Sequence, residues 1–445
     1  MQQNTKGVSG VVGLSGVSIL GDPYLAESAR PLNVFSAEAI EFLDDVSRVL
    51  LKTPQAKAYP DVVTFGFWCR KASILGMKGR QGQARNSGGD EGGARVGLGL
   101  AFHISPSNVP VNFAYSLVTG LLAGNANIVR VPSKPFEQVD IIKGALRSAA
   151  EKHPQMAPYV SLVRYGHEKS ITDAFSAMCD LRIIWGGDAT IAAIRESPLK
   201  ARAREITFAD RYSIAVIDAR HYLEDLDGGN RKKIAEGFYN DTYLTDQNAC
   251  TSPKLVVWLG DGKELVSEAQ KLFWEELAVV VGEKYELGAA QAVMKLAALF
   301  KIGAAGLPAA YQGAWVAEGS LDCFASLAMT EVDGPDGLVG AAGPGTSLMR
   351  VAIESLSPET MAYAFHSGFF LEYATDDLGD LLPVCGKQCQ TVGYLGSKEA
   401  IVSFIESCRP AGVDRVVPIG KTMDFSLSWD GYDLIEAMSR RIVFE

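Results

Sequence analysis

Residues 96–104 read VGLGLAFHI, and this apolar run opens a segment from 96 to 129 that contains no Asp, Glu, Lys or Arg. A long uncharged segment raises the question of a membrane span. Two polar, turn-forming stretches interrupt it, S-P-S-N at 105–108 and G-N-A-N at 124–127. Because both stretches divide the segment into short pieces, the pattern predicts a buried β-α-β unit and no membrane span.

The same alternation of apolar strands and helices continues along the chain. The expected strands are 96–104, 127–131, 159–163, 181–185 and 213–217. The expected helices between them are 111–122, 136–152, 171–177 and 189–196. Strand, helix and strand at this spacing predict a parallel sheet with helices on both faces.

The length of 445 residues predicts two or three domains. We expect a first domain over 1–240, with a flexible Gly-rich loop at 76–97, and a second domain over 241–410. The second block has its own strand at 254–258 and helices at 265–280 and 289–299. Residues 411–445 are expected to form a C-terminal extension, with a closing helix, that packs back on the active site.

Composition excludes several classes of function. A formal net charge of -10 argues against nucleic acid as a partner, because phosphate binding needs clustered Lys and Arg. Seven scattered cysteines fit a reducing compartment, and we expect a cytoplasmic protein. Cys385 and Cys389 lack a second ligand pair nearby, so no metal site is predicted. The apolar run from Gly7 to Gly21 is predicted to form strands and not a signal peptide.

Cys250 is the strongest candidate for a chemically active residue. It lies in D-Q-N-A-C-T-S-P at 246–253, among small and polar neighbours. A structural cysteine normally lies in an apolar run, whereas a loop beside hydroxyls and amides can hold a reactive thiolate. A buried structural cysteine remains the alternative from this pattern alone.

Two further segments carry candidate site residues. Prolines flank Asn108, so its side-chain amide could be aimed at an oxyanion, although Asn is also a good helix N-cap. The others lie at the ends of expected strands or where the next helix opens: Ser105, Arg130, Ser133, Lys134, Gly186, Gly187 and Thr190. Such strand ends can bind the phosphates of a dinucleotide, but the G-x-G-x-x-G fingerprint is absent, so the pattern alone predicts this site weakly.

Taken together, these segments resemble the aldehyde dehydrogenase superfamily, and most closely the fatty acyl-CoA reductases that supply aldehyde in bacterial bioluminescence. The resemblance runs from about residue 95 onward and includes N-A-C-T-S-P around Cys250 and W-D-G at 429–431. It implies an α/β fold with two Rossmann-like parallel-sheet domains, one for the cofactor and one for catalysis, and a small C-terminal oligomerisation extension.

The resemblance also assigns roles to the candidate residues. Cys250 matches the nucleophile, and Asn108 matches the residue that holds the oxyanion. Arg130, Ser133 and Lys134 match the strand end that holds the adenosine ribose, and Gly186 and Gly187 match the turn beside the pyrophosphate. Superfamily relatives usually form oligomers, so a homo-oligomer is expected.

Two departures from the superfamily pattern refine the expected reaction. Phe208 stands where hydrolytic relatives carry the Glu that activates water, with Glu205 and Asp210 nearby but offset. Without that base an acyl-enzyme would hydrolyse slowly, which favours a reductase. Lys134 stands where many NAD-preferring relatives have a Glu, and a cation there favours NADPH.

We therefore expect NADPH-dependent reduction of an acyl thioester to an aldehyde through an acyl-cysteine. The acyl donor would be acyl-CoA or an acyl-protein thioester. One alternative is an aldehyde dehydrogenase that makes an acid or a thioester. Another is an acyl-accepting subunit that works only in a complex with an acyl-transferring partner protein.

Overall fold

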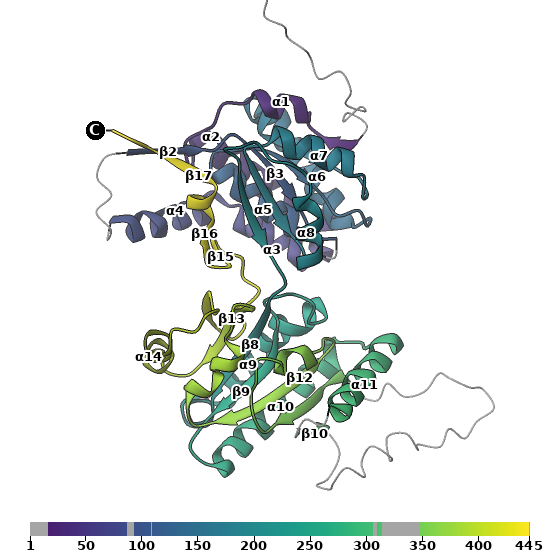
Figure 1. The fold of residues 1–445 in the computed structure, drawn as a ribbon, viewed down its shortest axis with the longest axis vertical. Helices are drawn as coiled ribbons and strands as arrows, with labels where there is room; N and C mark the ends of the chain where they lie inside the picture. The colour runs from purple at the N-terminus through teal and green to yellow at the C-terminus, as the bar shows by residue number, and fades with distance from the viewer. Residues whose placement is uncertain (1–16, 87–92, 108, 306–308, 314–346, 445) are drawn as a thin grey trace, which may run out of the picture. The chain divides into compact units, whose positions relative to one another are not determined.

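The computed structural model describes residues 17–86, 93–107, 109–305, 309–313 and 347–444. Within these residues the chain folds into two compact units (Figure 1). Unit 1 comprises Met1–Asp210 together with Phe425–Glu445, and unit 2 comprises Arg211–Asp424. The chain therefore leaves unit 1, builds the whole of unit 2, and returns to complete unit 1.

A six-stranded sheet forms the centre of unit 1. Its strands, in spatial order, are β1 (Ser18–Leu20), β5 (Val160–Val163), β4 (Ala126–Arg130), β3 (Leu100–Ile104), β6 (Leu181–Trp185) and β7 (Arg204–Phe208). All are parallel except β1, which runs antiparallel to β5. Because parallel strands need helical crossovers, the predicted doubly covered sheet is confirmed.

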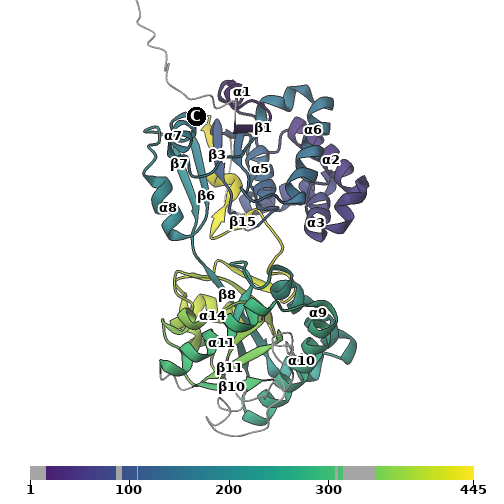
Figure 2. The ribbon, with the colours of Figure 1, turned by 90° about the vertical axis from the view of Figure 1, so that its right-hand side faces the viewer.

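Helices cover both faces of this sheet (Figure 2). One side carries α7 (Lys169–Met178) and α8 (Asp188–Arg195). The other carries α2 (Ala37–Lys52), α3 (Pro60–Trp68), α5 (Asn112–Leu122) and α6 (Glu137–Lys152). The short helix α1 (Pro23–Ser28) precedes them along the chain. The apolar residues of these elements form one continuous core.

The Gly-rich segment differs from the predicted loop. Helix α4 (Lys71–Asn86) occupies its first half, including Gly76 and Gly79. Glycine weakens a helix, but Ile74 and Met77 of α4 are buried in the core of unit 1. Tertiary burial of one helix face therefore outweighs the low helix propensity. Residues 87–92 of the predicted loop lie outside the described part of the chain.

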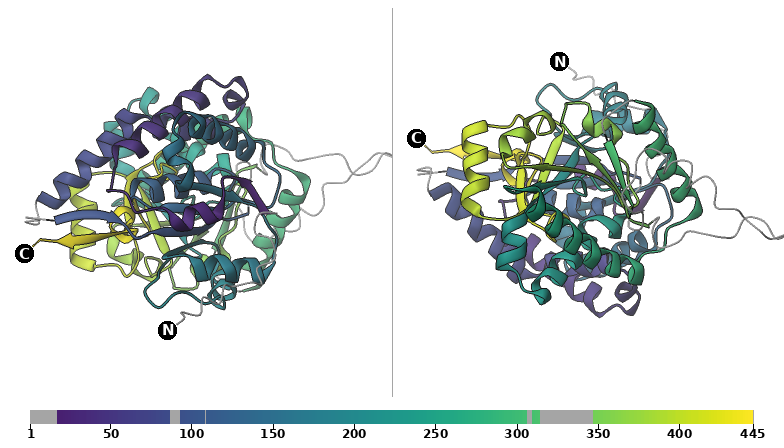
Figure 3. Two further views of the ribbon diagram at one scale, coloured as in Figure 1. Left: turned by 90° about the horizontal axis from the view of Figure 1, so that it is seen from above. Right: turned by 90° about the horizontal axis from the view of Figure 1, so that it is seen from below.

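The predicted strand at 96–104 is two strands. Strand β2 (Gly93–Gly97) ends before Gly99, whose φ of 136° turns the chain, and β3 then enters the sheet. Strand β2 pairs antiparallel with β17 (Ser439–Val443), so the two lie side by side although they are far apart in sequence (Figure 3). The expected closing helix is correspondingly short, α15 (Leu434–Ala437).

A seven-stranded sheet forms the centre of unit 2. Its spatial order is β10 (Ala309–Gly313), β11 (Met349–Ile353), β12 (Phe369–Thr375), β9 (Pro253–Leu259), β8 (Tyr212–Asp218), β13 (Cys389–Leu395) and β14 (Arg415–Pro418). All are parallel except β10, which runs antiparallel to β11. Their amino ends therefore meet at one edge, which is called the amino edge below.

Strand β9 shows how the two faces of this sheet are covered. Val256 and Trp258 pack into a cluster with α9 (Gly228–Thr242) and α10 (Lys263–Lys284). Leu255 and Val257 pack into a second cluster with α11 (Ala289–Ala304) and α14 (Lys398–Cys408). The continuous apolar run of β9 fits a strand buried on both faces.

The domain limits expected at 240/241 and 410/411 do not coincide with those of the two units. Residue 240 lies inside α9, and β8, expected in the first sheet, pairs with β9 and β13 of the second. The expected extension at 411–445 is divided, because β14 belongs to unit 2 and β17 to unit 1. Among the described residues, no helix has the length and apolarity that crossing a bilayer requires.

Candidate active site

Cys250 lies in the turn that leads into β9 at the amino edge of the second sheet. A short 3-10 helix, Tyr243–Thr245, ends at Asp246, and both Asp246 (φ 51°) and Gln247 (φ 57°) have left-handed backbones. Asp tolerates this conformation better than most residues, so the local sequence permits the sharp reversal. The turn places Cys250 three residues before β9 begins at Pro253.

Gln247 anchors this turn to the neighbouring strand β12. Its buried side-chain amide donates to the carbonyl oxygens of Pro253 (2.8 Å) and Phe369 (3.2 Å). Its side-chain oxygen accepts from the N–H groups of Gly368 (3.0 Å) and Phe369 (3.2 Å). A fully satisfied buried amide fixes both segments, so the cysteine turn is held against the start of β12.

Cys250 is only partly buried, unlike four of the other described cysteines. Cys69, Cys179, Cys385 and Cys389 are buried, whereas Cys250 and Cys408 have intermediate exposure. The Ser213 hydroxyl donates to the Cys250 carbonyl oxygen at 2.7 Å, which holds the backbone of the turn. As a residue, Cys250 therefore differs from the four cysteines of the apolar core.

Lys254, in the second position of β9, is the cation that acts on Cys250. Burial lowers the pKa of the Lys254 ammonium, and the negative charge of the Cys250 thiolate opposes that shift. The interaction is reciprocal, because an ammonium that is stabilised by a thiolate also stabilises the thiolate. Lys254 was not predicted from the sequence, although it is the one charged residue in the strand P-K-L-V-V-W-L.

Asp246 is the centre of a hydrogen-bonded network at the same edge. Its carboxylate accepts from the Ser367 hydroxyl at 2.9 Å and from the Tyr285 hydroxyl. The His366 ring is hydrogen bonded to Ser367 (2.8 Å) and lies 3.9 Å from the Asp246 carboxylate. Burial lowers the pKa of His366, and the negative charge of Asp246 opposes this shift. The positive charges of Lys254 and Lys295 lower the pKa further.

Lys295 of α11 lies buried behind this network. Its ammonium donates to the carbonyl oxygens of Ser367 (2.7 Å) and Gly368 (3.2 Å). Burial lowers the pKa of Lys295 to about 7, against the opposing charge of Asp246. The amino edge of unit 2 therefore collects several ionisable groups beside the cysteine turn.

Asn108 lies outside the described residues. The elements on either side of it are described: β3 ends at Ile104 and α5 begins at Asn112. Val111 occupies the N-cap position of α5. The oxyanion role of Asn108 stays a prediction.

The other predicted residues follow strands at the carboxyl edge of the first sheet. Ser105 follows β3, and its hydroxyl oxygen is buried with no partner among the described residues. Ser133 and Lys134 are exposed in the loop after β4, and Thr190 is exposed on α8. In open parallel sheets, ligands bind at this edge.

Arg130, the last residue of β4, is already engaged by the protein. Its guanidinium donates to the carbonyl oxygens of Tyr165 (3.4 Å) and Gly166, and lies 4.5 Å from the centre of the Tyr165 ring. Arg164, the first residue after β5, was not predicted. Its Nε and Nη2 atoms are buried and have no hydrogen-bond partner among the described residues.

Gly186 and Gly187 form the turn between β6 and α8, as predicted, but carboxylates also lie there. Asp210 accepts from the N–H of Asp188 at 3.1 Å, at the N-terminus of α8. In return, the Asp188 side chain accepts from the N–H of Asp210 at 3.4 Å. A phosphate at this helix end would meet negative charge as well as the free N–H groups of the helix.

Glu205, the carboxylate nearest before Phe208 in the sequence, is engaged in ion pairs. Glu205 forms ion pairs with Arg182 and with Arg195, the latter at 2.7 Å. Burial acts to raise the pKa of Glu205, but the hydrogen bonds and charges of Arg195 and Arg182 outweigh it and lower that pKa. Phe208 itself is buried and stacks on Trp185 with ring centres 3.6 Å apart.

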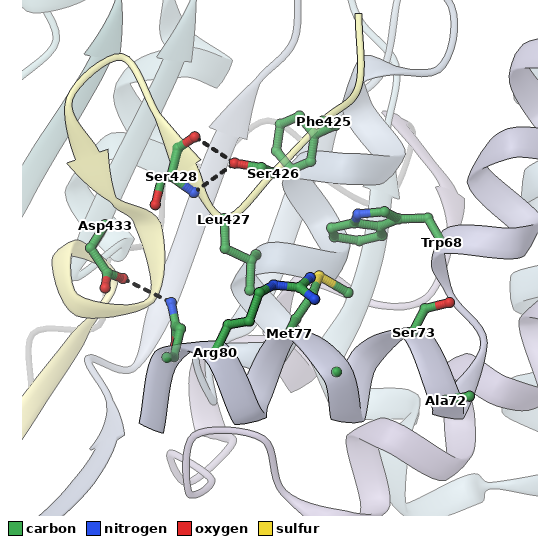
Figure 4. A pocket seen from close by; sticks show the side chains of 12 residues that line it. Trp68, Ala72, Ser73, Met77, Arg80, Phe425, Ser426, Leu427, Ser428 and Asp433 are labelled. Atoms are coloured by element: carbon green, nitrogen blue, oxygen red, sulfur yellow. Dashed lines mark hydrogen bonds between the residues drawn. The ribbon is translucent and has the colours of Figure 1, made fainter. Parts of the chain in front are cut away.

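A cavity of about 580 Å³ lies in unit 1 between α3, α4 and the returning C-terminal segment (Figure 4). Trp68 and Phe425, whose ring centres are 5.5 Å apart, provide an aromatic wall with Met77 and Leu427 nearby. Arg80 lines it as well. Polar side chains, among them Ser73, Ser428 and Asp433, also line it.

The comparisons with known proteins agree with the predicted resemblance. Residues 90–283 match the family model of the acyl-CoA reductases (LuxC). A long-chain acyl-protein thioester reductase of Aliivibrio fischeri is 27% identical over 178 residues, which are 39% of this chain and 35% of that protein. Long-chain acyl-protein thioester reductase 2 of Photobacterium leiognathi is 26% identical over 184 residues, which are 40% and 34% of the two chains. The matches thus span about a third of the curated relatives' length.

Solved structures decide the fold. Aldehyde dehydrogenase 21 of Physcomitrella patens superposes with a TM-score of 0.56 at 13% identity, over 97% of this chain and 87% of that one. The chain has the fold of the aldehyde dehydrogenases, and its residues 90–283 are similar to the acyl-CoA reductases (LuxC). A glyceraldehyde-3-phosphate dehydrogenase of Bacillus halodurans, complexed with NADP, has a TM-score of 0.52 at 15% identity and covers 95% and 85% of the two chains. The LuxC-like match begins just before β2 and includes the cysteine turn.

Proposed function

We propose that this chain reduces an acyl thioester to an aldehyde through an acyl-cysteine at Cys250, with NADPH as the reductant. The observation that carries the proposal is the position of Cys250, partly exposed in an anchored turn beside Lys254. The similarity of residues 90–283 to the acyl-CoA reductases (LuxC) supports it. So do the relatives named long-chain acyl-protein thioester reductases.

The first chemical step belongs to Cys250. Its thiolate attacks the thioester carbonyl, a new sulfur–carbon bond forms, and the bond to the donor's sulfur breaks, so that the donor leaves as a thiolate. The N–H of Cys250 and the side-chain amide of Asn108 are proposed to hold the oxyanion. The Lys254 ammonium favours the charged form of Cys250 both before attack and after the aldehyde leaves.

A nicotinamide dinucleotide fits the carboxyl edge of the first sheet. The unpartnered hydroxyl oxygen of Ser105 needs a hydrogen-bond partner, and Arg164 and Lys134 supply positive charge for phosphate. When bound, NADPH supplies a hydride to the acyl carbon. The preference for NADPH over NADH is supported by these cations.

Hydrolysis to a free acid is disfavoured by the state of the nearby carboxylates. Glu205, the carboxylate nearest in sequence before Phe208, is held by Arg182 and Arg195, and its pKa is lowered. A base with a low pKa activates water poorly. This observation favours the reductase over the aldehyde dehydrogenase alternative.

Two features of the donor and the assembly belong to the same proposal. The names of the relatives support an acyl-protein donor, delivered by an acyl-transferring partner protein, beside acyl-CoA. The chain is proposed to act as a homo-oligomer. Activity that appears only when such a partner is present would favour the acyl-accepting-subunit alternative.

The central test joins turnover with chemical trapping. The protein is mixed with NADPH and acyl-CoA of several chain lengths, and the loss of nicotinamide absorbance is followed. Incubation with acyl-CoA alone should add one acyl group to the intact protein's mass, and Cys250→Ser should abolish this addition. The Cys408→Ser variant, which alters another partly exposed cysteine, should retain it. Acyl label kept by Cys250→Ser would refute the assigned nucleophile.

A further inference from the structure

Arg164 has hydrogen-bonding capacity that the protein does not use. The Nε and Nη2 atoms of its guanidinium are buried, and among the residues that the structure describes neither has an acceptor. The backbone N–H of Arg164 donates to the carbonyl oxygen of Val17 at 2.9 Å. A buried charge without a partner destabilises a folded protein, so these donors need an anion from outside the chain.

The neighbouring arginine does not share this property. Arg130 is the last residue of β4, and it stands opposite Val163, the last residue of β5. Its guanidinium is held by the carbonyl oxygens of Tyr165 and Gly166 and by the Tyr165 ring. Of two arginines at adjoining strand ends, one is part of the scaffold and the other has unmet donors.

The position of Arg164 in the sheet indicates which phosphate of a dinucleotide would lie near it. The pyrophosphate is expected at the turn between β6 and α8, and β5 is three strands away from β6 in the sheet. Neighbouring strands are about 4.8 Å apart, so this separation is about 14 Å. The adenosine ribose is expected at the end of β4, directly beside β5. A phosphate group near Arg164 is therefore one attached to that ribose.

We propose that Arg164 binds the 2′-phosphate of NADPH and thereby sets the preference for NADPH over NADH; this rests on the proposed function. A guanidinium presents paired N–H donors that match phosphate oxygens, and Nε and Nη2 form such a pair. Lys134, exposed on the loop after β4, adds positive charge without this directional match. NADH lacks the phosphate and would leave the Arg164 donors unmet.

The test measures nucleotide binding to the full chain, independently of turnover. Dissociation constants of NADP⁺, NAD⁺, 2′,5′-ADP and 5′-AMP are determined by calorimetry for the wild type and for Arg164→Met. We expect the variant to lose roughly ten- to a hundredfold in affinity for NADP⁺ and 2′,5′-ADP, the range of a charge-assisted pair. Affinity for NAD⁺ and 5′-AMP should change by less than about twofold.

A stability measurement separates binding from a structural role. Because Arg164→Met removes two buried N–H donors that have no acceptor among the described residues and keeps the apolar stem, the melting temperature without nucleotide should stay the same or rise. Arg164→Lys keeps the positive charge but lacks the paired N–H donors of the guanidinium. This variant should therefore lose only part of the affinity for NADP⁺. Arg147→Ala, an exposed arginine on α6, is the control and should change neither quantity.

The outcomes are distinct. Unchanged NADP⁺ affinity in both Arg164 variants, or an equal loss for NADP⁺ and NAD⁺, would overturn the assignment while leaving the proposed function intact. A lower melting temperature with no selective loss would assign Arg164 a structural role instead. A wild-type protein that binds neither nucleotide would overturn the proposed function itself.

Discussion

The hydroxyl of Ser213 donates a 2.7 Å hydrogen bond to the carbonyl oxygen of Cys250. This bond joins the second residue of β8 to the turn that precedes β9, so two adjacent strands hold the candidate nucleophile by its backbone. The bond fixes the backbone carbonyl of the candidate nucleophile. Precise positioning of this kind is what nucleophilic attack requires.

Removing this bond should affect acylation more than folding. Ser213→Ala leaves a backbone carbonyl without its partner, and we expect the free energy of unfolding to fall by about 1 kcal/mol. The rate of Cys250 acylation by acyl-CoA should fall roughly five- to tenfold, because a loosened turn samples the attacking geometry less often. Mass spectrometry at timed intervals measures the rate. Ser28→Ala, an exposed serine on α1, should leave it unchanged.

Lys254 should control the pH at which Cys250 reacts. Because its ammonium and the Cys250 thiolate stabilise each other, Lys254→Met should move the pH midpoint of Cys250 alkylation upward. Iodoacetamide labelling between pH 5 and pH 10 gives the midpoint. Lys254→Arg keeps the charge and should restore most of the wild-type profile. An identical midpoint in wild type and Lys254→Met would show that the ammonium does not act on the sulfur.

The carboxylate at the N-terminus of α8 should weaken dinucleotide binding. Asp210 accepts from the Asp188 N–H, where a pyrophosphate would otherwise be stabilised. We expect Asp210→Asn to tighten NADP⁺ binding by about two- to fivefold, the range for a charge at a helix end. Calorimetry measures this, with Asp140→Asn on α6 as the control. Weaker binding in Asp210→Asn would place the pyrophosphate elsewhere.

His103 should make the protein sensitive to acid. The ring is buried between Ser116 (2.7 Å) and Asn127 (3.0 Å), and burial lowers its pKa from 6.5 to about 4. Between these values the unfolded chain binds a proton that the folded chain does not, so stability falls as the pH drops from about 6.5 to 4. The loss should approach about 3 kcal/mol at pH 4. Urea unfolding at several pH values should show a shallower slope for His103→Gln, and no change of slope for the exposed His167→Gln.

Local pattern was sufficient for strands β3–β6, β8 and β9 and for helices α5–α8, α10 and α11. Strands such as β6 and β9 are apolar runs bounded by polar turns, and these signals lie within a few residues. The position of Cys250 in a turn followed from its polar neighbours in the same way. The loop-like glycines of α4 misled the prediction, because the burial of Ile74 and Met77 depends on distant parts of the chain.

The remaining features depend on contacts between segments far apart in sequence. Strand β8 looks like its predecessors, and nothing in its residues states that it pairs with β9 and not with β7. Arg130 and Arg164 are both arginines at strand ends. Only the structure shows that the carbonyl oxygens of Tyr165 and Gly166 engage the first. A residue's availability for a ligand is a property of its neighbours.

The pairing of β2 with β17 has a consequence for biosynthesis. Gly97 pairs with Ser439, so the ribosome must release all of unit 2 before the edge of β2 can be covered. Nascent domains fold largely in order of emergence, and a bare strand edge invites intermolecular pairing. Newly made chains should therefore pass through a stage at which unit 2 is already folded while β2 still offers an open edge, and chaperones would be needed most at that stage.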